Sequence, residues 1–460
     1  MPGFGPEVAA ACLLLVATRA WLGDRLAGPR RDWLVAAASV VVVASWQLAG
    51  VVVTLLLAGL TWLATRRSRS GLARLPTGIV ILVLLAPLAV FKYWPWFAPH
   101  LGETWRPRTA WVVPLGLSFT VFRLIGALMD SRALRLTPAA PRLFLLATFF
   151  PTFPSGPITT LQSLRDLDND DLRGALVEGG RRIVRGLARK VLLADPLHAF
   201  VVGPWLRPGV AQLEPYQCLV LPVLLGFYVY WDFAGYSDVA IGVARLVGYR
   251  VPENFDRPYL SRNLVEFWRR WHITLSEWIR TRLMMKMAGR RAGPWRLRGA
   301  TLASMAICGL WHGAGTGYLA WGLWHGLGLI AVHALRDFRP RLEDAPARVP
   351  SELSAVAATA TTFAFVSVGW VFFFFSPGDA ILLVSGALSW RGGAGAASLV
   401  PLLTIGTLVV AYLGQGAARA VWARLPGVIR RVATAILLGL LTYALFLASG
   451  QPREFLYVQF

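Results

Sequence analysis

Long apolar runs, separated by short gaps rich in arginine, recur along most of this chain of 460 residues. About 20 consecutive apolar residues allow a helix to cross a bilayer. The gaps carry clusters such as Arg66-Arg67-Ser68-Arg69 and Arg181-Arg182, the pattern of cytoplasmic loops that face anionic lipid. Because backbone groups in hydrocarbon must be satisfied within the chain, the pattern predicts an all-α, multi-pass protein of the cytoplasmic or inner membrane.

Composition supports this interpretation and excludes others. Apolar residues make up 56% of the chain and charged residues only 15%, whereas a soluble chain is about a quarter charged. The net charge of +22 would suggest nucleic acid in a soluble protein, but here the basic residues lie between apolar runs. Twenty Trp residues suit a protein with many interfacial anchors. Membrane lipids, and not nucleic acid, are therefore the expected partners of the basic residues.

The N-terminal half predicts several individual elements. No basic region precedes Val8–Leu22, so we expect a retained first span with its N-terminus outside. The run from Trp33 to Ala64 has arginines at both ends, which predicts a hairpin turning near Ser45-Trp46-Gln47. Gly78–Tyr93 is expected to lead outward to the aromatic belt Tyr93-Trp94-Pro95-Trp96-Phe97, and Val112–Met129 to return. Further apolar runs lie at 190–206, 216–231, 300–312, 317–334, 355–375, 398–413 and 432–449.

Three segments depart from regular spans. Leu143–Ile158 contains three prolines and a glycine, so it predicts a broken or re-entrant element. Leu161–Glu178 is polar and predicts an amphipathic surface helix, and Arg262–Arg298 mixes ten Arg and Lys with four Trp, as suits the cytoplasmic interface. With hairpins and broken pieces included, we expect about 11 spans. We expect one membrane domain over 1–460, with a core at 110–335 and C-terminal spans and tail at 355–460.

Two histidines lie inside the nearly uncharged stretch from Ala300 to Val332, each in a Leu-Trp-His-Gly frame. A neutral imidazole in hydrocarbon needs a hydrogen-bond partner, so an intramembrane histidine is a functional candidate by default. Imidazole also has the unperturbed pKa best suited to proton transfer near neutral pH. We interpret His312 as an active-site residue and His325 as a packing residue.

Residues 231–272 are unusually polar for this chain. On a continuous helix, Trp268 and His272 would share a face, and Glu266 would pair with Arg269. The carboxylates of the region are expected to pair with nearby arginines and hold it in shape; these are Asp232, Asp238, Glu253 and Glu266. The cysteines are far apart and show no metal-ligand spacing, so neither a metal site nor a disulfide framework is expected.

The chain resembles the membrane-bound O-acyltransferases, in particular the bacterial branch with alginate O-acetyltransferase and the D-alanyl transferase of teichoic acids. Asp232-Phe-Ala-Gly-Tyr-Ser-Asp238, Pro252-Glu-Asn-Phe255 and Glu266-Phe-Trp-Arg-Arg-Trp-His272 carry most of the specificity. The other matching stretches are Pro114-Leu-Gly-Leu-Ser-Phe119, Phe149-Phe-Pro…Ser-Gly-Pro157, Gly186-Leu-Ala-Arg-Lys-Val-Leu-Leu-Ala-Asp195, Arg257-Pro-Tyr-Leu-Ser-Arg262 and Gly309-Leu-Trp-His-Gly313. The resemblance implies helices around a central funnel.

The resemblance implies roles for particular residues. It makes His312 the family's membrane-embedded active-site histidine and His272 its second polar member. The family often has Gly-Ala-Asn after the histidine, whereas this chain has Gly313-Ala-Gly-Thr316, so hydrogen bonding there is expected to differ. No tightly bound cofactor is expected, and the acyl donor would be a cytoplasmic thioester such as acetyl-CoA. Arg269 and Arg270 could hold its phosphates or could face lipid.

The acceptor side is implied in the same way. The tail Phe455-Leu-Tyr-Val-Gln-Phe460 resembles that of the polysaccharide-acylating branch, in which a tyrosine has been proposed to carry the acyl group. Arg430 and Arg431 predict that the tail emerges outside, so Tyr457 would pass the group toward an extracytoplasmic polysaccharide, with an SGNH-esterase-type partner protein. Direct acylation of a lipid or a small secreted metabolite is an alternative. A transporter is another, although only one broken element, near 149–157, was found.

Overall fold

The computed structural model describes residues 6–22, 28–66, 74–102, 113–167, 172–289, 291–338, 352–389, 405–410 and 412–414, with the single residues 424 and 426. These residues form two compact units that alternate along the chain. The first unit combines the residues up to Gly186 with Tyr236–Asn254, and the second combines Leu187–Gly235 with the residues from Phe255 on. Helix α11, Pro215–Leu246, runs from the second unit into the first.

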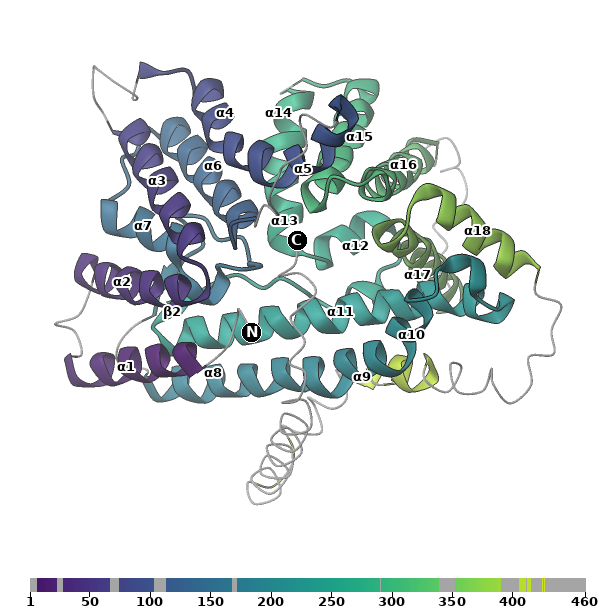
Figure 1. Ribbon diagram of the computed structural model, residues 1–460, viewed down its shortest axis with the longest axis horizontal. Helices are drawn as coiled ribbons and strands as arrows, with labels where there is room; N and C mark the ends of the chain where they lie inside the picture. Colours follow the sequence, from purple (N-terminus) through teal and green to yellow (C-terminus); the bar gives the residue numbers. More distant parts are fainter. Residues whose placement is uncertain are drawn as a thin grey trace. The chain divides into compact units, whose positions relative to one another are not determined.

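Both units are predominantly helical (Figure 1). The elements of the first unit are α1 (Pro6–Leu22), α2 (Pro29–Trp46), α3 (Leu48–Thr65), α4 (Thr77–Leu88), η3 (Ala89–Tyr93), α5 (Trp94–Phe97), η4 (Ala98–Leu101), α6 (Leu117–Leu134), α7 (Ala140–Thr148), η6 (Phe150–Thr152), β1 (Arg165–Asp166), α8 (Leu172–Leu187) and β2 (Tyr249–Arg250). Those of the second unit, besides most of α11, are η8 (Ala188–Ala194), α9 (Asp195–Leu197), η9 (His198–Val202), α10 (Gly203–Leu206), η10 (Val210–Gln212), η11 (Pro258–Leu260), α12 (Leu264–Arg270), α13 (Ile273–Trp278), η12 (Ile279–Met284), α14 (Met285–Ala288), α15 (Pro294–His312), α16 (Thr316–Phe338), α17 (Glu352–Phe374) and α18 (Pro377–Leu388).

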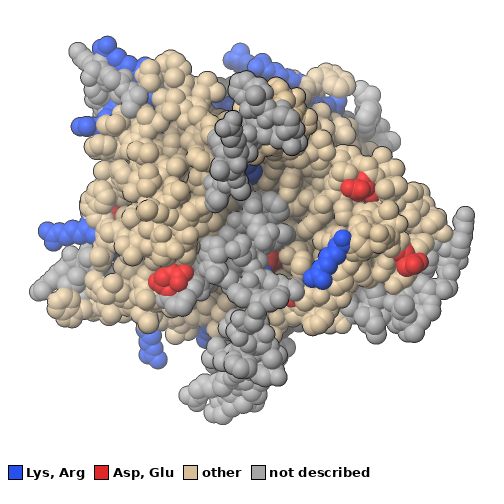
Figure 2. Space-filling view, viewed as in Figure 1, with Lys and Arg blue, Asp and Glu red and all other residues tan. Residues whose placement is uncertain are grey.

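Five helices of the described residues are long and apolar enough to cross a membrane. They are Leu48–Thr65, Thr77–Leu101, Pro215–Leu246, Thr316–Leu335 and Glu352–Phe374. Large aliphatic and aromatic side chains are exposed on many of the helices, and most of the face in Figure 2 is neither acidic nor basic. A multi-pass membrane protein is therefore confirmed. The larger number of about 11 spans stays a prediction, and the run at 432–449 lies outside the described residues.

The predicted turn near Ser45-Trp46-Gln47 is confirmed, and of the two helices beside it Leu48–Thr65 is among the candidate spans while Pro29–Trp46 is not. Helices α2 and α3 meet at Gln47, whose φ of −161° and ψ of 107° are extended. The predicted span Val112–Met129 begins later, because α6 starts at Leu117 after the left-handed turn at Gly116. At Gly116 a side chain would clash, since a Cβ would lie 2.7 Å from the Phe153 carbonyl oxygen.

The broken element at Leu143–Ile158 is confirmed, and its polar groups are satisfied by buried side chains. Helix α7 ends at Thr148 and a short 3₁₀ turn follows. The guanidinium of Arg123, 1% exposed, donates to the Thr152 carbonyl. The backbone N–H of Ser155 donates to Tyr236 Oη at 3.1 Å. Irregular backbone can persist at membrane depth only under this kind of cover.

The predicted surface helix over Leu161–Glu178 is wrong in its first part. Residues 165–166 form strand β1, which pairs antiparallel with β2, and the amphipathic helix α8 begins only at Leu172. Ion pairs hold this ribbon: Arg142 contacts Asp166 at 2.8 Å and Asp32 at 3.1 Å. Burial opposes the charge of Arg142, but the hydrogen bond and negative charge of Asp166, and the charge of Asp32, raise its pKa. Local polarity alone did not reveal these long-range pairs.

Helices α15 and α16 approach closely through glycines (Figure 1). A Cβ at Gly309 would lie 2.1 Å from the carbonyl oxygen of Tyr318. A Cβ at Gly322 would lie 2.3 Å from the carbonyl oxygen of Met305. Small residues that let backbones touch are the usual basis of helix packing in membranes, where lipid removes the hydrophobic drive.

We predict that Gly309→Ala lowers the free energy of unfolding by about 1–3 kcal/mol, because the added methyl must push two backbones apart. The matched control is Gly299→Ala on the same helix, where a Cβ meets nothing within 4 Å and alanine favours the helix. Thermal unfolding of both purified proteins in detergent is the measurement. Equal stability of the two variants would contradict the assigned packing.

Candidate functional site

His272 lies at a break in the helical path. Asn263 caps the start of helix α12, because its side chain accepts a hydrogen bond from the Glu266 N–H. The Glu266 carboxylate in turn accepts a hydrogen bond from the Arg262 N–H. The helix ends at Arg270, and α13 begins only after His272, which has a φ of 40°. The predicted continuous helix through His272 is therefore wrong. Few non-glycine residues adopt the left-handed region, and those that do cluster at functional sites.

His312 is the last residue of α15. The helix ends there because Gly313 turns into extended backbone, with the Tyr318 ring packed against it. A Cβ on Gly313 would lie 2.1 Å from Cε2 of Tyr318, so no other residue fits without a shift. The glycine of the Trp-His-Gly frame thus places His312 at a helix end.

An aromatic cluster surrounds the buried ring of His312. Trp321 lies edge-on at a centroid distance of 5.2 Å and Phe373 at 5.2 Å, and the neighbouring Trp311 at 4.7 Å. The residue is 2% exposed. Packing against these three rings constrains the orientation of the imidazole.

Trp311 connects the two predicted site histidines. Its ring centroid is 6.4 Å from that of His272 and 4.7 Å from that of His312. Phe233 of α11 packs edge-on against His272 at 4.8 Å. Burial lowers the pKa of the His272 imidazole to about 3, so the ring is neutral near neutral pH. The structure therefore brings both histidines into one cluster.

His325 belongs to the same cluster. It is fully buried, with Phe267 stacked at 6.1 Å and Trp268 and Trp321 at 5.2 and 5.0 Å. Neither ring nitrogen has a hydrogen-bond partner among the residues that the structure describes. Trp321 contacts both His312 and His325, so the two Trp-His-Gly frames meet at one indole.

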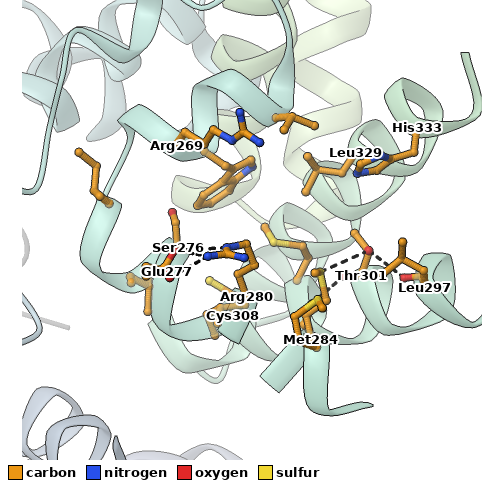
Figure 3. A pocket seen from close by; sticks show the side chains of 18 residues that line it. Arg269, Ser276, Glu277, Arg280, Met284, Leu297, Thr301, Cys308, Leu329 and His333 are labelled. Carbon is orange, nitrogen blue, oxygen red and sulfur yellow. Dashed lines mark hydrogen bonds and ion pairs between the residues drawn. The ribbon is translucent and has the colours of Figure 1, made fainter. Parts of the chain in front are cut away.

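A cavity of about 370 Å³ lies between α12–α14 and helices α15 and α16. Its walls are mostly apolar, with a few polar groups that Figure 3 labels, including Ser276, Thr301 and His333. The α15 wall is a single stripe of side chains: Leu297, Thr301, Ser304, Met305 and Cys308. His312 is the next residue on that stripe, one helical turn beyond Cys308. The stripe of α15 that lines the cavity therefore continues to His312, which is not itself in the lining.

The two candidate phosphate-binding arginines differ. Arg269 lines the cavity (Figure 3). Arg270 pairs with Glu266 at 2.7 Å, which replaces the predicted pair between Glu266 and Arg269. Arg280, at the cavity wall, is paired with Glu277 at 2.7 Å. Arg269 is thus the better placed of the two for a ligand in this cavity.

The other polar groups of the region form ion pairs. Asp238 accepts hydrogen bonds from Arg182 at 2.8 Å and Arg185 at 2.6 Å, and Glu253 pairs with Arg182, as predicted. Asp232, which is fully buried in α11, instead contacts a lysine, Lys190, at 2.7 Å. Lys190 also contacts Asp195 at 2.9 Å. Asp232 directly precedes Phe233, so this pair fixes the part of α11 that supports His272.

Two features were missed in the sequence. Lys190 and Asp195 stand at the two ends of the apolar stretch Val191–Ala194, and charges beside such a stretch signal buried partners. The cavity stripe on α15 has spacings of four, seven, eight and eleven residues, typical of one helix face, but nothing in the pattern says whether such a face lines a cavity or packs. Tyr457 lies outside the described residues. Among the residues that are described, no cluster of three His, Cys, Asp or Glu side chains could hold a metal ion.

Comparison with known proteins gives one consistent result. Residues 39–348, which contain both His272 and His312, match the model of the membrane-bound O-acyltransferase family. A probable alginate O-acetylase of Pseudomonas putida is 32% identical over 84% of this chain and 82% of its own. A homologous probable alginate O-acetylase of Pseudomonas aeruginosa is 33% identical over 76% and 68%. A peptidoglycan O-acetyltransferase of Helicobacter pylori is 28% identical over 64% and 61%.

We predict that Lys190→Met destabilises the protein by about 3–5 kcal/mol, because it leaves Asp232 buried and without its cation. The double change Lys190→Met with Asp232→Leu should recover most of this loss, since a well-packed apolar pair replaces the ions. Asp195, 23% exposed, keeps access to solvent in both variants. Thermal unfolding in detergent distinguishes the two. A double variant as unstable as the single one would show that the pair has no such role.

Proposed function

Since the chain belongs to the membrane-bound O-acyltransferase family, we propose that it moves an acyl group, acetyl in the first instance, from a cytoplasmic thioester to a hydroxyl of an extracytoplasmic polysaccharide. The chain is an O-acyltransferase by its family and its relatives. The donor, the acceptor and the roles of individual residues are our proposal. The location of the protein in the cytoplasmic or inner membrane is also part of this proposal.

The observation that carries the proposal is the position of His312. Its ring is buried and held by three aromatic side chains at a helix end. Cys308, one helical turn away, lines the cavity of about 370 Å³. An acetyl thioester placed in this cavity would bring its carbonyl toward the imidazole while apolar walls exclude water, which favours transfer to a hydroxyl over hydrolysis.

The proposed step transfers the acyl group from the sulfur of the thioester to the oxygen of the acceptor hydroxyl. The acceptor hydroxyl attacks the thioester carbonyl, a C–O bond forms, and the C–S bond breaks. His312 takes the hydroxyl proton as general base and returns a proton to the departing thiolate. His272, which is neutral, orients the acceptor hydroxyl in this step.

The donor is proposed to enter past the basic segment Arg262–Arg298. Acetyl-CoA carries phosphates, and a guanidinium binds phosphate in a bidentate manner. Arg269, which lines the cavity, supports such a contact directly. Arg270 keeps its bond to Glu266, so it would contribute only its remaining N–H groups. No tightly bound cofactor is part of this mechanism.

The proposed acceptor is inferred from the names of the relatives. Their names specify alginate and peptidoglycan as the substrates of O-acetylation, both of which are polysaccharide polymers outside the cytoplasm. We propose a polymer of that class here, with Tyr457 as an acyl carrier and an SGNH-esterase-type protein as the partner that completes the transfer. A phenol beside a histidine base is a competent acceptor for an acetyl group.

We predict that His312→Ala lowers the ester content of the secreted polysaccharide by roughly 100-fold or more, because the general base is lost. The ester content is measured after alkaline release of acetate, and the amount of protein in the membrane is measured in parallel. His100→Ala, at an exposed histidine of the first unit, is the matched control and should be unchanged. Normal acetylation by His312→Ala would remove the proposed mechanism.

We predict that Tyr457→Phe abolishes acetylation of the polymer while the purified enzyme still releases thiol from acetyl-CoA in the presence of a small alcohol. This split follows if the phenol is the acceptor of the first acyl transfer and His312 its base, because a small alcohol can then take the place of the phenol. The same alkaline assay and a thiol assay measure the two halves. Full acetylation in cells by Tyr457→Phe would exclude the carrier role and leave the role of His312 untouched.

A further inference from the structure

A second pocket, of about 690 Å³, lies in the first unit, far along the chain from the histidines. The end of α3, the residues before α4 and the end of α6 form its walls, with Arg66, Leu75 and Ser131 among them. Helices Leu48–Thr65 and Thr77–Leu101 are two of the five candidate spans. The pocket therefore lies where two spans end, at the level of the lipid headgroups.

The charge of this pocket is of one sign. Four arginines line it: Arg66, Arg74, Arg132 and Arg135. None of the described residues in its lining is acidic. Among the residues that the structure describes, no carboxylate comes within ion-pair distance of Arg66, Arg74 or Arg132. No described carboxylate thus neutralises the charge of these three arginines, and a concave surface concentrates the resulting field.

Arg132 is held rigidly in the wall. Its guanidinium donates to the Leu75 carbonyl at 2.7 Å, to Thr77 Oγ1 at 3.0 Å and to the Ala64 carbonyl at 3.3 Å. A guanidinium has five N–H donors, so two remain for a ligand. The arginine is therefore oriented in advance, which lowers the entropy that a ligand must overcome on binding.

The N-terminus of α4 adds to the positive field. Its N-cap position is Pro76, and no side chain caps the first turn. The uncapped amides at the start of a helix, together with its dipole, attract anions. Thr77, the first residue of the helix, is also in the pocket lining.

The backbone at Arg135 is a further, independent sign. Arg135 follows α6 with a φ of 53°, and the Leu136 N–H bonds the Ser131 carbonyl at 2.9 Å, which is the pattern of a glycine C-cap. Glycine adopts this conformation more readily than arginine. An arginine in this unfavourable conformation, in the lining of a charged pocket, supports a role of its side chain in binding.

We propose that this pocket binds a phosphate group. Planar guanidinium forks match phosphate oxygens in a bidentate manner, and several converge here with a helix N-terminus. The group could belong to an anionic lipid headgroup or to a soluble phosphate compound. The position of the pocket at the ends of two candidate spans favours the headgroup. The proposal does not depend on the acyl-transfer reaction.

The test uses the full-length protein in a maltoside detergent and its unfolding temperature. The probes are phosphatidylglycerol, a neutral monoglyceride, inorganic phosphate and ADP, all at matched ionic strength. We expect phosphatidylglycerol to raise the unfolding temperature and the monoglyceride to leave it unchanged. In the double variant Arg66→Gln with Arg74→Gln, the concentration needed for half of this shift should rise roughly tenfold or more, because two charge-assisted contacts are lost.

The arms of the test separate the sources of phosphate. A shift with phosphatidylglycerol alone identifies a headgroup, and an equal shift with phosphate or ADP identifies a soluble ligand. The matched control is Arg165→Gln, at an exposed arginine of β1 that lies outside the pocket, which should behave as the wild type. No shift with any phosphate probe, or equal loss in the control, would overturn the proposal.

A second variant guards against a loss of folding. Arg135→Gly places glycine where the backbone favours it, so the ligand-free protein should unfold at the same temperature as the wild type or higher. Its response to the phosphate probe should nevertheless weaken. A full response by Arg135→Gly would show that the side chain is not a ligand and that the pocket does not select it.

Discussion

The need to satisfy polar groups away from water governs both units of this protein. Arg123 and Tyr236 cover the broken segment after α7, and Lys190 neutralises Asp232 within α11. Each of these contacts joins residues far apart in the chain. An unpaired polar group in hydrocarbon costs several kcal/mol, so these pairs determine where irregular backbone and charge can exist. The positions of the histidines follow from that framework.

Close packing supplies what polar contacts do not. Glycines let α15 and α16 touch, and Gly313 makes room for the Tyr318 ring beside His312. Because the helices are this close, the rings of Trp311, Trp321 and Phe373 enclose the imidazole. In the proposed mechanism this apolar enclosure excludes water, which would otherwise compete as the acyl acceptor. Packing and proposed chemistry therefore depend on the same small residues.

Local patterns in the sequence predicted local features well. The turn at Gln47 and the broken segment before Ile158 were each predicted from short stretches. That Asp238 pairs with arginines was predicted, but its partners Arg182 and Arg185 lie 56 and 53 residues away and were not identified. Features that depend on distant residues were not predicted. Strand β1 forms because β2 and Arg142 reach it from elsewhere, and His272 leaves the helix because its turn is stabilised by packing on Phe233 and Trp311. Periodicity carries no information about such partners.

The two Trp-His-Gly frames show why a motif needs its surroundings. In the first, glycine ends a helix; in the second, Gly326 lies within α16, where a Cβ would be 3.0 Å from Leu302. His312 therefore stands at a helix terminus, one turn beyond the stripe of α15 that lines the cavity, whereas His325 lies within α16, packed against aromatic rings and Gly369. Each histidine lies one helical turn from a residue that lines the cavity, Cys308 for His312 and Leu329 for His325. The helix end at Gly313, and not nearness to the cavity, is therefore what distinguishes His312. The same four letters thus place one buried histidine at a helix end and the other inside a helix.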